Sequence, residues 1–199
     1  LFFAAVFNPI LFLKGSGITI AGNIAVSTTF AFMYTLKKSL GQHFLKDEEI
    51  IHQIINAAKE MHPKQLLEIG PGGGAITKHL MQLTDVDFKA IELDKEKIDY
   101  LEHTFPALKG KLIHQSILNA EKPFEGMFHA VGNFPYNISS QILFKILDWK
   151  DEVQGVVGMF QKEVAQRIAA KEGNKSYGIL SVLVQAYFEV EYMFDVDEN

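Results

Sequence analysis

The residues best suited to ligand chemistry stand where a buried strand is expected to end, in the sequence Asn133-Phe134-Pro135-Tyr136. The apolar run over residues 127–132 predicts the strand, Pro135 ends its ladder, and Ser139 or Ser140 can cap the helix that follows. An Asn side chain can accept a hydrogen bond from an exocyclic amine, and a Tyr ring can stack on a flat base. The four residues therefore suit a nucleobase, although the same pattern is also typical of a simple strand-ending turn.

A glycine-rich loop provides a second candidate ligand site. Residues 65–69 predict a strand that runs into Gly70-Pro71-Gly72-Gly73-Gly74, and a helical pattern follows the loop. Glycines permit a tight turn and a close approach of the backbone to a ligand at the helix start. Glu92 lies in the next expected strand, 22 positions after Gly70, about where an acid that binds ribose hydroxyls belongs. Strand, loop, helix and acid together favour nucleoside binding.

Two cofactor classes compete for this site. The spacing Gly70-x-Gly72-x-x-Ala75 also fits the dinucleotide fingerprint, so an NAD-dependent enzyme is one alternative. Glu68, two residues before the first glycine, instead suits a cationic or amine-bearing ligand, and no acid–base pair for hydride transfer accompanies the Asn133 turn. S-adenosylmethionine fits better, because transfer of an activated methyl group needs positioning more than strong acids or bases.

The composition of the chain excludes several classes of functional site. The chain has 199 residues, 48% of them hydrophobic, which suffices for one good core. It contains no Cys, which excludes disulfides, thiolate zinc sites and Cys nucleophiles. The seven His are scattered without paired ligand spacing, so we assign no metal. A formal net charge of −5 argues against an extended nucleic-acid-binding surface but is compatible with a local basic face.

The elements that must position these residues alternate between strands and helices. Strands are expected over residues 65–69, 88–94, 111–114, 127–132, 153–160 and 186–196. Helices are expected from the Asp47 cap toward Pro63, over 94–105, after Ser139, and over 161–170 and 177–185. This alternation predicts an α/β fold with a Rossmann-like, mostly parallel sheet and helices on both faces.

Residues 1–32 differ from the rest of the chain. They begin without Met and carry Lys14 as their one charge. The apolar run over residues 1–13 contains Pro9 and is too short to span a membrane, and no basic region precedes it as in a secretory signal. We expect a non-native or upstream-translated segment, with Met33 as the natural start and residues 33–199 as the methyltransferase domain.

Taken together, the motifs resemble the ribosomal RNA adenine N6,N6-dimethyltransferases, the small-subunit rRNA methyltransferase A family. The resemblance runs in order from residue 33 to about residue 196. The matching stretches are Gly41 to Leu45, Glu68 to Gly73, Ile91 to Asp94, Gly132 to Ser139, Gln161 to Arg167 and Tyr177 to Val182.

The family implies an S-adenosylmethionine-dependent enzyme that dimethylates two adjacent adenines in a hairpin near the 3′ end of small-subunit rRNA during ribosome maturation. The expected catalytic residues are Asn133, Phe134, Pro135 and Tyr136. The expected cofactor-binding residues are Gln42, His43, Leu45, Glu68, Gly70, Gly72, Glu92, Ser116 and Asn133. The resemblance also implies a cytoplasmic monomer that acts on a pre-ribosomal small subunit, with no membrane partner.

Several departures and alternatives accompany the resemblance. His43 stands where the family usually has Asn, and Ser116 stands where an Asp commonly holds the cofactor adenine. The family continues into a small helical domain, so we expect residues 33–199 to be C-terminally incomplete. The alternatives are a large-subunit rRNA methyltransferase of the macrolide-resistance type and a non-catalytic RNA assembly factor.

Overall fold

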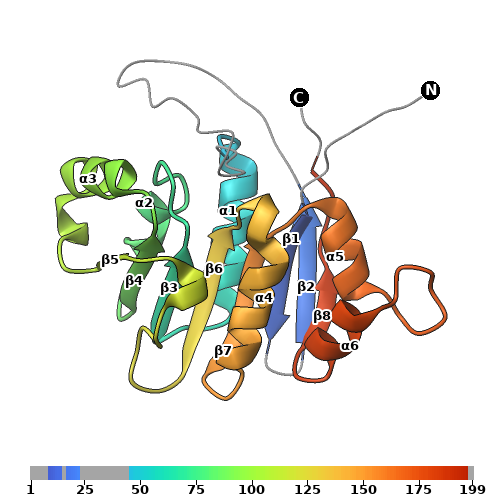
Figure 1. The fold of residues 1–199 in the computed structure, drawn as a ribbon. Helices are drawn as coiled ribbons and strands as arrows, with labels where there is room; N and C mark the ends of the chain where they lie inside the picture. Colours follow the sequence, from blue (N-terminus) through green and yellow to red (C-terminus); the bar gives the residue numbers. More distant parts are fainter. Residues whose placement is uncertain (1–8, 15–16, 23–44, 197–199) are drawn as a thin grey trace.

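Five parallel strands form the centre of the computed structural model, which describes residues 9–14, 17–22 and 45–196. They run side by side in the order β7-β6-β3-β4-β5 (Figure 1). Their bounds are Gln65–Ile69 for β3, Asp87–Glu92 for β4, Leu112–His114 for β5, Phe128–Asn133 for β6 and Val153–Met159 for β7. The α/β class and the parallel sheet expected from the sequence are therefore confirmed.

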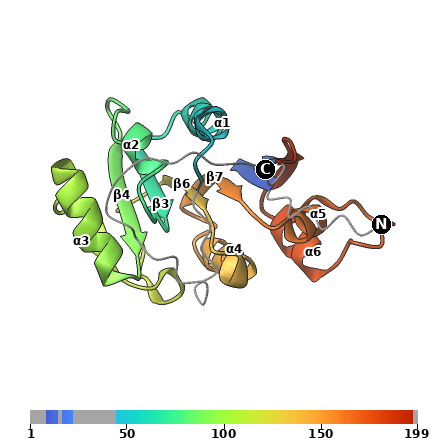
Figure 2. The ribbon, with the colours of Figure 1, turned by 90° about the horizontal axis from the view of Figure 1, so that it is seen from above.

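Helices connect these strands and cover both faces of the sheet. They are α1 (Glu48–Glu60), α2 (Thr77–Leu80), α3 (Lys95–Thr104), α4 (Ser139–Asp148), α5 (Lys162–Ala169) and α6 (Ile179–Gln185). Short 3₁₀ turns add η2 (Pro106–Leu108), η3 (Ile117–Asn119) and η4 (Tyr136–Ile138). Figure 2 places α1 and α4 on opposite sides of the strands.

Each face of the sheet has its own apolar core. The apolar side chains of α1 pack with those of the α2 and α3 region on one face, against Leu66, Phe88 and Val131. Those of α4, α5 and α6 pack on the other face, against Leu67 and Ala130. Leu66 and Leu67 point to opposite faces because side chains alternate along a strand. The near-continuous burial of β3 and β6 is what a strand covered on both faces requires.

The N-termini of α1 and α4 show whether the helix caps expected from the sequence are present. The Asp47 carboxylate accepts hydrogen bonds from the backbone N–H groups of Glu49 at 2.8 Å and Ile50 at 3.2 Å, which confirms the predicted cap. The expected Ser cap of α4 is wrong. Ile138 occupies the cap position, and the Ser139 hydroxyl donates to the Tyr136 carbonyl at 3.2 Å because η4 leads directly into the helix.

Two strands from the N-terminal segment extend the sheet beyond β7. The strands β1 (Pro9–Lys14) and β2 (Gly17–Gly22) pair antiparallel, and β1 also pairs with β7 and with β8 (Glu189–Tyr192). The sequence alone gave no reason to place strands there. The foreign origin of residues 1–32 stays a prediction, since strand pairing shows where a segment lies and not where it comes from.

Candidate functional site

The candidate site lies where the order of the central strands reverses. The chain runs from β3 outward to β4 and β5 and then returns to β6 on the other side of β3. Open α/β sheets bind ligands at such a point, outside the carboxyl ends of the strands. Gly70 follows β3 and Asn133 ends β6, so the two motifs found in the sequence meet here.

The glycine loop packs directly against the turn after β6. Gly70 has φ +72°, in the left-handed region, and its N–H donates to the Ile91 carbonyl at 2.9 Å. A Cβ at this position would lie 3.7 Å from Pro135 Cδ, within ordinary contact distance, so backbone conformation rather than lack of space favours glycine. The loop and the turn therefore form adjoining walls of one site.

Glu92 joins the glycine loop to the end of β4. Its Oε1 accepts hydrogen bonds from the backbone N–H groups of Leu93 at 2.8 Å and Asp94 at 2.9 Å. Its Oε2 accepts from the Gly72 N–H at 3.3 Å and lies 3.7 Å from the Nζ of Lys97, which is also buried. A carboxylate offers about four acceptor positions. Glu92 thus holds the glycine loop and the segment after β4 in place through its hydrogen bonds. Its contact with a ribose stays a prediction.

Glu68 places a buried carboxyl group in the same site. Its side chain is 1% exposed, and Oε2 has no hydrogen-bond partner among the residues that the structure describes. Burial raises the pKa of Glu68 from 4.5 to about 8; the neighbouring Thr77 hydroxyl opposes this rise, and the nearby charge of Glu92 adds to it. A buried acceptor without a partner, beside a hollow, fits a ligand that brings a donor or a positive charge.

The turn after β6 divides its residues between the site and the core. Asn133, Phe134 and Pro135 all line the hollow next to the glycine loop. The Phe134 side chain is 1% exposed and its ring lies 4.9 Å from that of Phe160. Tyr136 is 9% exposed and does not line either hollow of the site described below. Its expected stacking on a target base stays a prediction.

A close fit between β6 and β7 fixes the Phe134 ring. A Cβ added at Gly158 would lie 2.1 Å from Phe134 Cε2, closer than any real contact. No local pattern in the sequence indicates this role of Gly158. The two residues come together because β6 and β7 pair in parallel, with Gly158 opposite Gly132. The ring fills the space that the missing side chain leaves and so anchors the turn that holds Asn133.

Two adjoining hollows make up the site. The narrow hollow, of about 70 Å³, is lined by Leu45, Glu68, the glycine loop, Lys97 and Asn133 to Pro135. The wide hollow, of about 420 Å³, is lined by Leu93, Gln115, Ser116, Ile117 and Ile138, among others. Both share Gly70, Glu92 and Pro135. The volume and apolar walls of the wide hollow suit a small flat ligand such as an adenosine group.

The remaining predicted residues can now be placed. Leu45 is buried and lines the narrow hollow, and its contact with the cofactor stays a prediction. The Ser116 hydroxyl lines the wide hollow but accepts a hydrogen bond from the Leu118 N–H at 3.3 Å, which uses one of its acceptor positions. Gln42 and His43 lie outside the described residues. Lys97 was not among the residues expected at the site, although its place on the helix that follows Glu92 was a signal for it.

Comparison with known proteins agrees with this geometry. The sequence model of the family described as "Ribosomal RNA adenine dimethylase" matches residues 33–199. The chain is 48% identical over 167 residues to the ribosomal RNA small subunit methyltransferase A of Cytophaga hutchinsonii, covering 82% of this chain and 64% of the relative. It is 51% identical over 165 residues to that of Parabacteroides distasonis, covering 82% and 62%. The chain thus spans less than two thirds of these relatives.

Solved structures give the same result for the fold. A dimethyladenosine transferase from Plasmodium falciparum matches with a TM-score of 0.61 and 29% identity, covering 71% of this chain and 51% of that one. The 23S rRNA methyltransferase ErmE matches with a TM-score of 0.58 and 26% identity, covering 66% and 53%. The chain belongs to the ribosomal RNA adenine dimethylase family of S-adenosylmethionine-dependent methyltransferases.

Proposed function

We propose that this protein transfers methyl groups from S-adenosylmethionine to the N6 atoms of two adjacent adenines in a hairpin near the 3′ end of small-subunit rRNA, during ribosome maturation. The observation that carries the proposal is the shared narrow hollow, which the Asn133 turn and the glycine loop line together. The choice of rRNA rests on the relatives. Relatives named ribosomal RNA small subunit methyltransferase A, such as those of Parabacteroides distasonis and Porphyromonas gingivalis, are 51% and 43% identical to the chain, whereas the 23S rRNA methyltransferase ErmE is 26% identical.

The described residues fit the cofactor. The unpartnered Oε2 of Glu68 would accept a hydrogen bond from the amino end, near Gly70 and Gly72. The wide hollow would hold the adenosine end between apolar walls, with Glu92 at the ribose and Ser116 at the adenine. Leu45 would contact the cofactor from the wall of the narrow hollow. Gln42 and His43 are also proposed to bind the cofactor. When bound, the sulfonium supplies an activated methyl group.

The chemistry of the target explains the need for Asn133. The lone pair of an adenine N6 amine is delocalised into the ring, so the amine is a poor nucleophile. As N6 takes the methyl group, the sulfonium would leave as a neutral thioether, and N6 would become pyramidal and carry positive charge until it loses one of its protons. The side-chain oxygen of Asn133 and the backbone carbonyl of Phe134 would accept hydrogen bonds from the N6 hydrogens. Such acceptors stabilise the transition state more than the ground state.

The other turn residues position these acceptors. Pro135 restricts the backbone after Phe134, and the buried Phe134 ring anchors the turn in the core. Tyr136 would stack on the extruded adenine, an interaction worth about 1–3 kcal/mol. Because Tyr136 is 9% exposed, this role requires its ring to turn outward when the base enters.

Two further properties belong to the proposal. We infer that the protein acts as a monomer on a pre-ribosomal small subunit, and that it does so in the cytoplasm. Among the described residues, no helix has both the length and the apolar character needed to cross a bilayer. The partner in this proposal is rRNA within an assembling small-subunit particle.

The test is transfer of labelled methyl groups to undermethylated ribosomal subunits by the protein encoded by the full coding region. We expect incorporation into small-subunit rRNA at two adjacent adenines, with two methyl groups on each. Incorporation into large-subunit rRNA would support the macrolide-resistance alternative instead. Binding of rRNA without incorporation would support the non-catalytic assembly factor, and binding of NAD with the affinity of S-adenosylmethionine would support the dehydrogenase alternative.

A further inference from the structure

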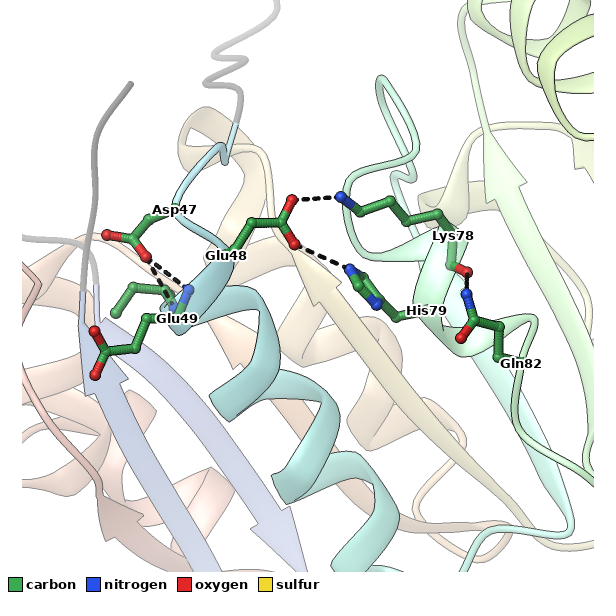
Figure 3. A network of polar contacts seen from close by, with 7 residues as sticks. Asp47, Glu48, Glu49, Lys78, His79 and Gln82 are labelled. Carbon is green, nitrogen blue, oxygen red and sulfur yellow. Dashed lines mark hydrogen bonds and ion pairs between the residues drawn. The ribbon is translucent and has the colours of Figure 1, made fainter. Parts of the chain in front are cut away.

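A second cluster of chemically capable side chains joins α1 to α2. Glu48 begins α1, His52 lies one turn later, and His79 lies on α2. Figure 3 shows the Glu48 carboxylate between His79 and Lys78, with one oxygen directed to each. The His52 and His79 rings meet edge to face, with centroids 5.3 Å apart. None of the three residues lines the narrow or the wide hollow.

The spacing of these groups is close to that of metal ligands. One ligand atom from each of Glu48, His52 and His79 lies within 4.8 Å of the other two. Zinc binds imidazole nitrogen and carboxylate oxygen at about 2.0–2.2 Å, so two ligands of a tetrahedral ion lie about 3.4 Å apart. Glu48 Oε2 and His79 Nε2 are already 3.3 Å apart. His52 is exposed, so its side chain is free of the packing that would prevent it from turning toward the other two ligands.

We propose that Glu48, His52 and His79 form a binding site for a divalent transition-metal cation of the zinc type. Two neutral imidazoles and one carboxylate are ligands that suit Zn²⁺, Co²⁺ and Ni²⁺ and do not suit Mg²⁺ or Ca²⁺. The fourth position of the tetrahedron would be taken by water, because the cluster faces solvent. This proposal is independent of the proposed methyl transfer.

A bound cation would connect two segments that both reach the cofactor site. Helix α1 begins three residues after Leu45, and α2 begins directly after Ile76. Leu45 and Ile76 both line the narrow hollow. The ion would therefore hold together two walls that are 31 residues apart in the sequence. Because the ligands come from two elements, binding should stabilise the folded chain over the unfolded chain.

Lys78 gives the proposal a specific signature. Its ammonium group pairs with Oε1 of Glu48 and leaves Oε2 to His79. A positive charge beside the site opposes a cation, so Lys78 competes with the metal for the carboxylate. Removing this charge should strengthen metal binding if Glu48 is a ligand. A metal held by the histidines alone would be much less sensitive to it.

Calorimetric titration of the whole chain with ZnCl₂ tests the site, with Co²⁺ as a spectroscopic probe. We expect one ion per chain, a visible absorption band of tetrahedral Co²⁺, and a thermal midpoint that rises by about 5 °C at saturating Zn²⁺. His52→Ala and His79→Ala should each weaken binding at least tenfold. Glu48→Gln should weaken it, and Lys78→Gln should strengthen it severalfold.

The matched control is His103→Ala, which removes an exposed His at the end of α3. It should bind Zn²⁺ as the parent does. Circular dichroism without metal should show that every variant is folded. Parental affinity in His52→Ala and His79→Ala, or equal loss in His103→Ala, would overturn the proposal. Unchanged affinity in Lys78→Gln would remove Glu48 from the ligand set and overturn the three-residue site.

Discussion

The buried carboxyl group of Glu68 should make the stability of the protein depend on pH in an unusual direction. Its side chain is 1% exposed, and burial raises its pKa from 4.5 to about 8. The folded protein therefore keeps a proton on Glu68 at neutral pH, whereas the unfolded chain has lost it. Glu68→Gln keeps the shape of the side chain and removes the titration.

The sign and size of the effect follow from proton linkage. Between pH 4.5 and about 8 the folded state binds the extra proton, so the free energy of unfolding falls as the pH rises. Burial lowers the pKa of His129 from 6.5 to about 4, which gives the opposite slope below pH 6.5. The two slopes nearly cancel there. From pH 6.5 to 8 the slope from Glu68 remains without the opposing slope from His129, and at 1.36 kcal/mol per pH unit the loss is about 2 kcal/mol.

The assay is thermal unfolding of the ligand-free protein between pH 5 and 8.5. The parental midpoint should fall by about 4–8 °C between pH 6.5 and 8, and the midpoint of Glu68→Gln should stay nearly constant. Glu60→Gln, an exposed substitution at the end of α1, is the matched control and should follow the parent. If Glu68→Gln and the parent lose stability equally over this interval, Glu68 is not the buried acid described above.

Three further predictions concern other parts of the fold. Glu92→Gln should weaken S-adenosylmethionine binding by about 1.5–3 kcal/mol in a calorimetric titration, and parental affinity would remove Glu92 from the site. Gly158→Ala should lower stability by about 1–3 kcal/mol or more in urea unfolding because its Cβ meets the buried Phe134 ring. Gly178→Ala, which meets nothing within 4 Å, is its control, and equal effects would contradict the fit. Deleting residues 1–32 should leave cofactor affinity unchanged, since the described residues of both hollows lie outside them; a loss above tenfold would make the segment part of the site.

Much of the site could be predicted because its parts are local patterns. The strand before Gly70 and the strand before Phe134 are each indicated in the sequence by a run of mostly apolar residues that ends at a turn residue. In a parallel sheet the carboxyl ends of such strands share one edge, so the two motifs had to lie near each other. The position of Glu92 could be predicted from its spacing from Gly70, because both belong to one unit of strand, glycine loop, helix and second strand.

The remaining features depend on contacts between distant residues. The fit of Phe134 over Gly158 requires the register of β6 against β7, which no local pattern encodes. The backbone hydrogen bonds to Glu92 depend on where α3 begins. The approach of His79 to Glu48 depends on how α2 packs beside α1, so scattered histidines gave no sign of a shared site.

Methyl transfer by Asn133→Ala tests the central claim most directly. With saturating S-adenosylmethionine and undermethylated small ribosomal subunits, the single-turnover rate should fall by about 10²–10³, the usual effect of losing one transition-state hydrogen bond. Circular dichroism and cofactor titration of the variant would separate this loss from unfolding or weakened binding. A parental rate of methyl transfer in Asn133→Ala would contradict the account.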